Sequence, residues 1–358
     1  MVVMFVGDCF TMTNEFQKGL LSNYYLKYCF LFNKLKDLYL TEEKSIDDKT
    51  CKLFSLMVKH DIEFLRYNKL LVGLGYILSQ NKVDLKDILK QRMRRFNKYV
   101  NEAKRICKVF SEHGIRFVLI KTFGSFPKDL GDLDILLYDD DLNDAEKLLS
   151  SAGYISRKIG LRQYLWSLRK DDVIVDVELH TKISAADYEY YPREHVFKRA
   201  VKCCELILPS YIDSLLILAG HAVMKDLFIT AADLLDFVIT LQKYRIDINE
   251  LINEANFLGL TLPLNTVLYI IKKLGCELEN NLRRELNVTF GVKLNDIVIR
   301  PPFHIVLLSY LDMTVKKAKQ KPLMNMLEEI FSLPRSKGID IFVRFAGSKK
   351  PLVKKFTE

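Results

Sequence analysis

The hydrophobic residues in the first part of the chain recur at spacings of three and four positions. This is the period of an amphipathic α-helix, and over residues 14–80 it predicts three helices. A polar stretch from Thr41 to Thr50 separates the first two of them. A further helix is predicted from about Asp84 to His113, because the following Gly114 is a common helix stop. The positions that carry the first pattern are Leu20, Leu21, Tyr24, Tyr25, Tyr28, Leu31, Phe32, Leu35, Leu53, Leu56 and Met57.

The next segment changes to short strands separated by turns. The β-branched and aromatic run over 115–121 predicts a strand that leads into a turn at Gly124-Ser125. The run over 132–138 (DLDILLY) predicts a second strand. A polar cluster at 139–141 then opens a helix that continues through Ser150 and ends at Gly153.

Further strands and helices are expected toward the C-terminus. We expect a strand over 154–159, a short helix over 161–168, and a strand over 173–183, where apolar and polar residues alternate. From Ser210 to about Leu333 the spacing is again helical, and a short strand is predicted over 338–345.

Composition favours a fold in which helix predominates, and with the predicted strands this gives an α+β class. The chain has only 15 glycines and 9 prolines in 358 residues, which argues against many short strands and tight turns. Hydrophobic residues make up 49% and charged residues 28%, a balance that excludes disordered and fibrous classes. We therefore predict a small mixed β-sheet core over 114–209, a helical N-terminal region over 1–113 and a helical C-terminal domain over 210–358.

The net charge points to a polyanionic partner. The chain carries 54 basic and 45 acidic residues, a formal charge of +9, and a pI near 9.0. Such a balance favours nucleic acid or a nucleoside triphosphate as partner. The basic helix over 90–108 is the best candidate for a nucleic-acid contact, and a solvated helix face is the alternative.

Cysteine usage and hydropathy bear on the compartment. Seven cysteines occur with no spacing suited to zinc, so reduced thiols and a cytoplasmic location are expected. The apolar start MVVMFVGDCF is too short for a signal segment and is expected to be the start of a strand or helix, or a leader ahead of a start at Met12. No segment reaches the roughly 18 apolar residues that a membrane span requires, so no membrane partner is expected.

Two carboxylates lie two positions apart on the second predicted strand. Since alternate residues of a strand point to the same face, Asp132 and Asp134 are expected side by side. Their like charges favour a hard divalent cation such as Mg²⁺, which keeps open positions for phosphate oxygens. The alternative is an acidic surface turn, which short carboxylate motifs often represent.

Two neighbouring segments add candidate groups. On the strand over 173–183, Asp176, Glu178 and His180 share one face, and an unpaired carboxylate is costly to bury, so this face is either solvated or an ion site. The Gly124-Ser125 turn offers backbone N–H groups and a hydroxyl that can approach phosphates, and an ordinary turn is the alternative.

Together these residues resemble the DNA polymerase β-type nucleotidyltransferase superfamily. Within it, the chain is most similar to the uncharacterised nucleotidyltransferase-like family with a large helical C-terminal part, and the resemblance covers about 115–335. A later helix of that family carries a histidine, a basic residue four positions after it, and an Asp-Leu pair further along. The matching residues here are Gly124-Ser125, Asp132-x-Asp134, Gly153-Tyr154, Glu178-Leu179-His180, His221-x₃-Lys225, Asp226-Leu227, Asp233 and Asp236.

The resemblance implies an α+β nucleotidyltransferase core and a reaction that depends on Mg²⁺ or Mn²⁺, with a nucleoside triphosphate as substrate. Asp132 and Asp134 would bind two metal ions, with Glu178 as the third carboxylate and Asp176 as the competing candidate for that position. Gly124-Ser125 would hold the β- and γ-phosphates. An unidentified hydroxyl acceptor on a protein, an RNA or a small molecule would attack the α-phosphorus and release pyrophosphate.

The sequence departs from the superfamily at two places. The interval from Gly124 to Asp132 is eight residues, shorter than is usual in active members, and Thr181 stands where an aromatic residue often follows the Glu178 motif. Lys121 or Lys128 would then supply positive charge that the Gly-Ser turn lacks.

The remaining candidates have two interpretations each. His221 and Lys225 lie one helical turn apart and either reach the triphosphate or are a satisfied histidine and a snorkelling lysine on a packing helix. Asp233 is a candidate to orient either of them by a hydrogen bond. His180 is either a structural partner of a carboxylate or a general base.

Two other functions compete with the enzyme. The short Gly-Ser to Asp interval favours a catalytically degenerate relative that binds a nucleotide or nucleic acid as a module. The other alternative is the toxin of a toxin–antitoxin pair that modifies tRNA or protein.

Overall fold

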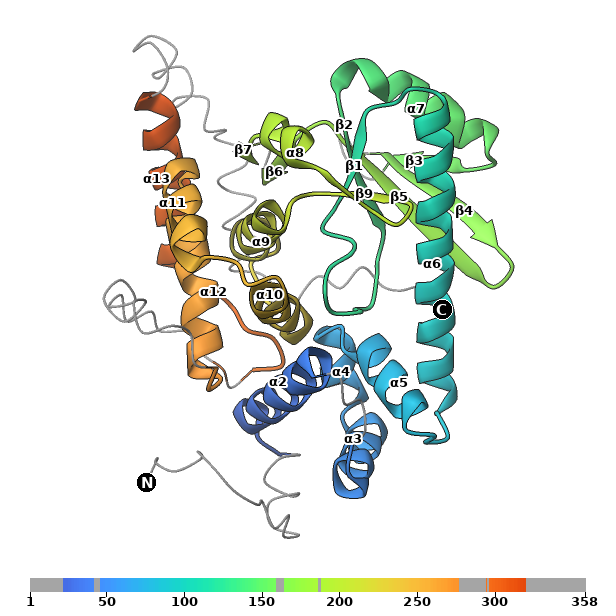
Figure 1. The fold of residues 1–358 in the computed structure, drawn as a ribbon, viewed down its shortest axis with the longest axis vertical. Helices are drawn as coiled ribbons and strands as arrows, with labels where there is room; N and C mark the ends of the chain where they lie inside the picture. The colour runs from blue at the N-terminus through green and yellow to red at the C-terminus, as the bar shows by residue number, and fades with distance from the viewer. Residues whose placement is uncertain are drawn as a thin grey trace.

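The structure is a computed structural model that describes residues 22–41, 46–158, 164–185, 188–276, 294 and 296–319. Within these residues the fold is α+β, as predicted, with one mixed sheet and many helices (Figure 1). The predicted apolar start and the strand over 338–345 lie outside the described residues. No helix in the described ranges is long and apolar enough to cross a membrane.

The N-terminal helices follow the predicted amphipathic period. They are α2 (Tyr24–Leu40), α3 (Asp48–His60), α4 (Ile62–Tyr67), α5 (Leu71–Gln80) and α6 (Asp87–Glu112). The prediction of three helices before residue 80 was wrong, because four lie in this part of the described chain. The side chains of Asn23 and Asp47 cap the first two, and the longest helix ends before Gly114, whose positive φ of 71° fits the predicted stop.

A five-stranded sheet forms the centre of the α+β part. Its strands are β1 (Phe117–Ile120), β2 (Leu133–Leu137), β3 (Ile155–Lys158), β4 (Tyr164–Lys170) and β5 (Val173–His180), in the order β1-β2-β5-β4-β3. Only β2 and β5 pair in parallel, so the sheet is mixed as predicted. Helix α7 (Asp139–Ser151) follows β2.

The helix predicted over 161–168 was wrong, since β4 begins within that range. The apolar residues there recur at helical spacing, but the segment pairs with β5 on one side and β3 on the other. Leu165 and Trp166 are both buried in this arrangement. Tertiary pairing therefore overrides the local period.

Small elements that the sequence pattern did not predict link the sheet to the C-terminal helices. They are β6 (Ile183–Ala185), β7 (Tyr188–Tyr191), α8 (Arg193–Arg199), β8 (Val201–Cys203) and β9 (Leu206–Leu208). The C-terminal part is helical, as predicted, through the end of the described chain. Its helices are α9 (Tyr211–Gly220), the π-helix η1 (His221–Asp226), α10 (Ala231–Lys243), α11 (Ile248–Leu258), α12 (Thr261–Lys273) and α13 (Phe303–Lys319).

Two hydrophobic cores hold these elements together. One lies between the sheet and helices α6 and α7, with Tyr99, Phe110 and Val175 among its members. The larger core unites the N-terminal helices with the C-terminal ones and includes Val118 and Ile120 of β1. Helix α10 packs directly on α2 in this core (Figure 1). The three-region division at 113 and 209 stays a prediction.

Phe126 anchors the loop between β1 and β2 to the N-terminal helices. Its ring is 1% exposed and lies edge-on to Tyr39 at 5.0 Å between centroids. Gly73 on α5 approaches it so closely that an added Cβ would collide with the ring.

We expect Phe126→Ala to lower the free energy of unfolding by about 3–5 kcal/mol, because it empties a fully packed aromatic site. Phe257 is 58% exposed, so Phe257→Ala is the matched control and is expected to change stability by less than about 1 kcal/mol. Urea denaturation of both variants measures the difference. Equal losses would show that Phe126 is not an anchor.

Candidate active site

A cleft of about 520 Å³ lies between the β1–β2 loop and the C-terminal helices. This volume is in the range of about 300–1,000 Å³ that small-molecule sites occupy. Its walls come from the loop, from one face of α9 and η1, from one face of α10, and from the end of α4. The predicted candidates Lys121, Gly124, Ser125, Asp132, Asp134, Glu178, His221 and Lys225 all line it.

The sheet register brings two of the predicted carboxylates together. Asp134 on β2 is the direct partner of Glu178 on β5 in the parallel pair. Neighbouring residues in register point to the same face of a sheet, and both side chains are buried. With His180, they offer ligand atoms that all lie within 4.8 Å of one another. These three side chains form a group able to hold one metal ion.

Asp134 is held by several hydrogen-bond partners. Lys121 Nζ lies 2.8 Å and His180 Nε2 lies 2.7 Å from Asp134 Oδ1, and the Asp134 backbone N–H donates to Thr122 Oγ1. Burial alone would raise the pKa of Asp134, but the Lys121 ammonium and His180 outweigh it and hold that pKa well below its usual range. Asp134 is therefore ionised at neutral pH.

Lys121 reaches Asp134 through an unusual backbone conformation. It follows β1 directly and has φ of +60°, in the left-handed region that non-glycine residues seldom adopt. Burial would lower its pKa, but Asp134 and Glu178 outweigh that effect and raise it, so the side chain stays charged. Strained residues of this kind concentrate at functional sites.

The other two carboxylate candidates are not members of this group of three. Asp132 directly precedes β2 and lines the cleft. Among the described residues, the ligand atoms close enough to share a metal ion belong to Asp134, Glu178 and His180. Asp176 accepts a hydrogen bond of 2.6 Å from Ser167 Oγ on β4. Among the described residues that line the cleft, β5 contributes Glu178 and not Asp176.

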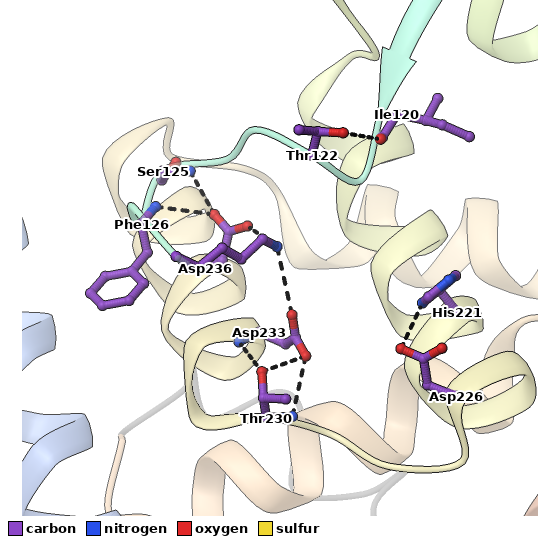
Figure 2. A network of polar contacts seen from close by, with 10 residues as sticks. Ile120, Thr122, Ser125, Phe126, His221, Asp226, Thr230, Asp233 and Asp236 are labelled. Atoms are coloured by element: carbon purple, nitrogen blue, oxygen red, sulfur yellow. Dashed lines mark hydrogen bonds and ion pairs between the residues drawn. The ribbon is translucent and has the colours of Figure 1, made fainter. Parts of the chain in front are cut away.

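The Gly124-Ser125 turn holds a carboxylate of the protein itself. The backbone N–H groups of Ser125 and Phe126 donate to Asp236 Oδ1, at 2.5 and 3.2 Å, as Figure 2 shows. Ser125 Oγ bonds Thr240 Oγ1 at 2.8 Å. Asp236 on α10 thus occupies the position where the resemblance implies phosphate oxygens. An added Cβ on Gly124 would collide with this carboxylate.

Lys128 completes this arrangement. Its Nζ lies 3.3 Å from Asp236 Oδ2 and 3.6 Å from Asp233 Oδ1. Burial would lower the pKa of Lys128, but these carboxylates outweigh it and raise that pKa. Asp233 also closes a capping box with Thr230 at the start of α10 (Figure 2). The charge of Lys128 is therefore offset by carboxylates of the protein itself.

The π-helix η1 presents His221 and Lys225 to the cleft. Single π turns are uncommon and often occur at functional sites. His221 Nδ1 lies 3.2 Å from Asp226 Oδ2, so Asp226 orients the imidazole (Figure 2). The suggestion that Asp233 does so was wrong, because Asp233 is engaged by Thr230 and Lys128. Burial lowers the pKa of His221, and Lys121 adds to this, so the ring is neutral at neutral pH.

Lys225 is a buried lysine of the cleft wall. Burial lowers its pKa and the Lys121 charge lowers it further, while Asp134 and Glu178 oppose the shift. In the part of the chain that the structure describes, its ammonium makes no ion pair. The ammonium groups of Lys121 and Lys225 are two positive charges at this end of the cleft, beside the carboxylates of Asp134 and Glu178.

Lys69 is a cleft residue that the sequence did not indicate. It follows α4 with φ of 56° and lines the cleft, and its charge lowers the pKa values of Asp226 and Asp233. More than 150 positions separate it from those residues in the sequence. No local pattern signals such a contact, because only tertiary packing creates it.

A mixed sheet with two carboxylates on adjacent parallel strands, beside a cleft lined by lysines and carboxylates, is the arrangement that the resemblance to nucleotidyltransferases implies. A comparison with models of protein families matches residues 74–275, more than half of the chain, to the uncharacterised nucleotidyltransferase family. The chain belongs to this family. No curated protein and no solved structure matches the chain. The matched segment contains every predicted site residue and leaves Lys69 outside.

The contact between Gly124 and Asp236 gives a matched pair of glycine variants. We expect Gly124→Ala to destabilise the protein, because its Cβ would displace the Asp236 carboxylate from the turn. Gly131→Ala is the control, since nothing lies within 4 Å of the Cβ it would add. Thermal denaturation compares the two. Equal melting temperatures would contradict the close approach of α10.

The depressed pKa of His221 predicts a loss of stability on acidification. As the pH falls below the ordinary value of 6.5, the unfolded chain protonates this histidine while the folded protein resists protonation. Stability is then present above that pH and decreases below it, by at most about 1.4 kcal/mol per pH unit for one proton. Urea denaturation between neutral and mildly acidic pH measures the slope. His221→Gln is expected to flatten it, and an unchanged slope would contradict the assignment.

Proposed function

We propose that the protein transfers a nucleoside monophosphate from a nucleoside triphosphate to a hydroxyl acceptor, with a divalent metal ion. The observation that carries this proposal is the pairing of Asp134 and Glu178 in a cleft beside Lys225, which makes no ion pair with the described residues. Membership of the uncharacterised nucleotidyltransferase family supports it. Within the proposal, the chain is a member of the DNA polymerase β-type superfamily and acts in the cytoplasm.

The donor set fits a hard divalent ion. Carboxylates are the ligand type that suits Mg²⁺ and Mn²⁺, and a ligand must be deprotonated to bind, which the depressed pKa of Asp134 ensures. Asp134 and Glu178 would hold the ion, with Asp132 at the same end of the cleft as a further candidate ligand. His180 hydrogen-bonds Asp134 and keeps its carboxylate oriented. When bound, such an ion neutralises phosphate charge and activates an acceptor hydroxyl.

The remaining polar groups have separate roles in the proposal. Lys225 binds a phosphate oxygen, because its ammonium has no carboxylate partner among the described residues. Lys121 contributes positive charge at the same end. His221 holds its Nδ1 proton toward Asp226, which leaves Nε2 as a hydrogen-bond acceptor for a hydroxyl group. Gly124-Ser125 supports α10 through Asp236 and does not contact phosphate unless that carboxylate moves.

A second function has specific support. Lys121 pairs with Asp134 where a metal ion would bind, and Asp236 fills the Gly-Ser turn. Both contacts neutralise, from within the chain, groups that an active enzyme uses for its substrate. They favour a degenerate module that binds a nucleotide without transferring it.

Substitution of the paired carboxylates tests the enzyme. We expect Asp134→Asn and Glu178→Gln each to lower transfer from α-labelled nucleoside triphosphate, with Mg²⁺ or Mn²⁺, by more than about 100-fold. Even loss of groups that merely support metal ligands costs about 10- to 100-fold. Asp176→Asn is the matched control on the same strand and is expected to retain activity. Equal loss in all three variants would contradict the assignment of Glu178.

Thermal denaturation separates the enzyme from the degenerate module. A ligand at about 100 times its dissociation constant stabilises the folded state by about 2.7 kcal/mol. Stabilisation of the wild type by metal and nucleotide without label transfer or pyrophosphate release would establish the module. No stabilisation and no transfer would exclude both functions.

A further inference from the structure

The end of the cleft away from the carboxylates is aromatic. Tyr211 at the start of α9 and Tyr244 after the end of α10 both line it, and their rings stack with centroids 3.6 Å apart and planes 14° apart. The two side chains keep 42% and 38% of their surface exposed. Val201, Leu208 and Pro209 line the cleft beside them. Apolar surface of this kind at the rim of a charged cleft suits a flat ring.

The two helices set the distance between the aromatic and the charged ends. On α10 the cleft-facing residues run from Asp233 through Asp236 and Thr240 to Tyr244, a distance of about 16 Å at 1.5 Å per residue. On the other wall, Tyr211 opens α9 and Lys225 lies in η1. A cation at one end and stacked rings at the other match a nucleotide that extends along the cleft, with its phosphates at Lys225.

We propose that Tyr211 and Tyr244 form the nucleobase subsite for the triphosphate. Stacking accepts every base, because each has a π-face, so the subsite selects a nucleotide over a bare polyphosphate and tolerates several bases. Tyr211 provides the more open ring, since Lys243 Nζ lies 5.5 Å from the Tyr244 ring centroid. This inference rests on the proposed binding of a triphosphate at the carboxylate end.

Calorimetric titration with ATP and with inorganic tripolyphosphate, both with Mg²⁺, tests the subsite. Base stacking on aromatic side chains predicts that the wild type binds ATP about tenfold more tightly, a difference of about 1.4 kcal/mol. Tyr211→Ala is expected to bring the two affinities together while leaving tripolyphosphate binding unchanged, and Tyr211→Phe is expected to preserve the difference. Tyr25→Ala is the matched control, because Tyr25 is 37% exposed and lies outside the cleft wall.

The outcomes distinguish the two proposals. If tripolyphosphate binds and ATP binds no more tightly, the nucleobase subsite is wrong while the phosphate site stands. Equal losses for both ligands in Tyr211→Ala would also overturn it. If neither ligand binds, the proposed function fails and the subsite fails with it. A preference for an oligoribonucleotide over every mononucleotide would overturn the inference and assign the tyrosines to the acceptor.

Cysteine alkylation of the wild type gives a second readout that needs no variant. Cys203 lines the aromatic end of the cleft, and the adjacent Cys204 is exposed outside its wall. We expect ATP with Mg²⁺ to slow iodoacetamide modification of Cys203 several-fold, as measured by peptide mass spectrometry, and to leave Cys204 unaffected. Tripolyphosphate is expected to protect neither. Unchanged modification of Cys203 under saturating ATP would overturn the subsite.

Discussion

The pairing of two carboxylates on adjacent parallel strands is the constraint on which the cleft depends. Asp134 and Glu178 are buried next to each other, and two negative charges in this position are unstable without cations. Lys121 pairs with Asp134, the His180 ring hydrogen-bonds it, and Lys225 lies close enough for its charge to act on both carboxylates. The left-handed backbone at Lys121 and the π-helix at His221 both serve this balance.

The same principle explains the second acidic group of the cleft. Asp236 would be costly to bury alone. The β1–β2 loop stabilises its carboxylate with two backbone N–H donors and the Lys128 ammonium. A turn that can cradle a phosphate can equally cradle a carboxylate, because both present anionic oxygens. In this chain the turn holds α10 through Asp236. Under the proposed function, the lysine side chains would therefore bind the phosphates in place of the turn.

The spacing of hydrophobic residues predicted most of the fold, and the alternation of side chains along a strand predicted part of the site. The helices and the strands β1, β2, β3 and β5 follow the hydrophobic spacing, whereas β4 has helical spacing and is a strand because of its neighbours. The alternation of side chains along β5 predicted that Glu178 and His180 share one face, and both lie beside Asp134. The contact of Asp236 with the Gly-Ser turn was beyond sequence analysis, since it joins segments more than 100 positions apart.

The cleft extends beyond the family segment. Residues 74–275 include the carboxylates, but Lys69, just after α4, and Tyr39 of α2, which packs on Phe126, lie upstream of residue 74. A fragment cut to the family boundaries would therefore expose the inner side of the β1–β2 loop and lose one flank of its binding surface. A fragment that keeps the whole cleft must therefore begin at or before α2.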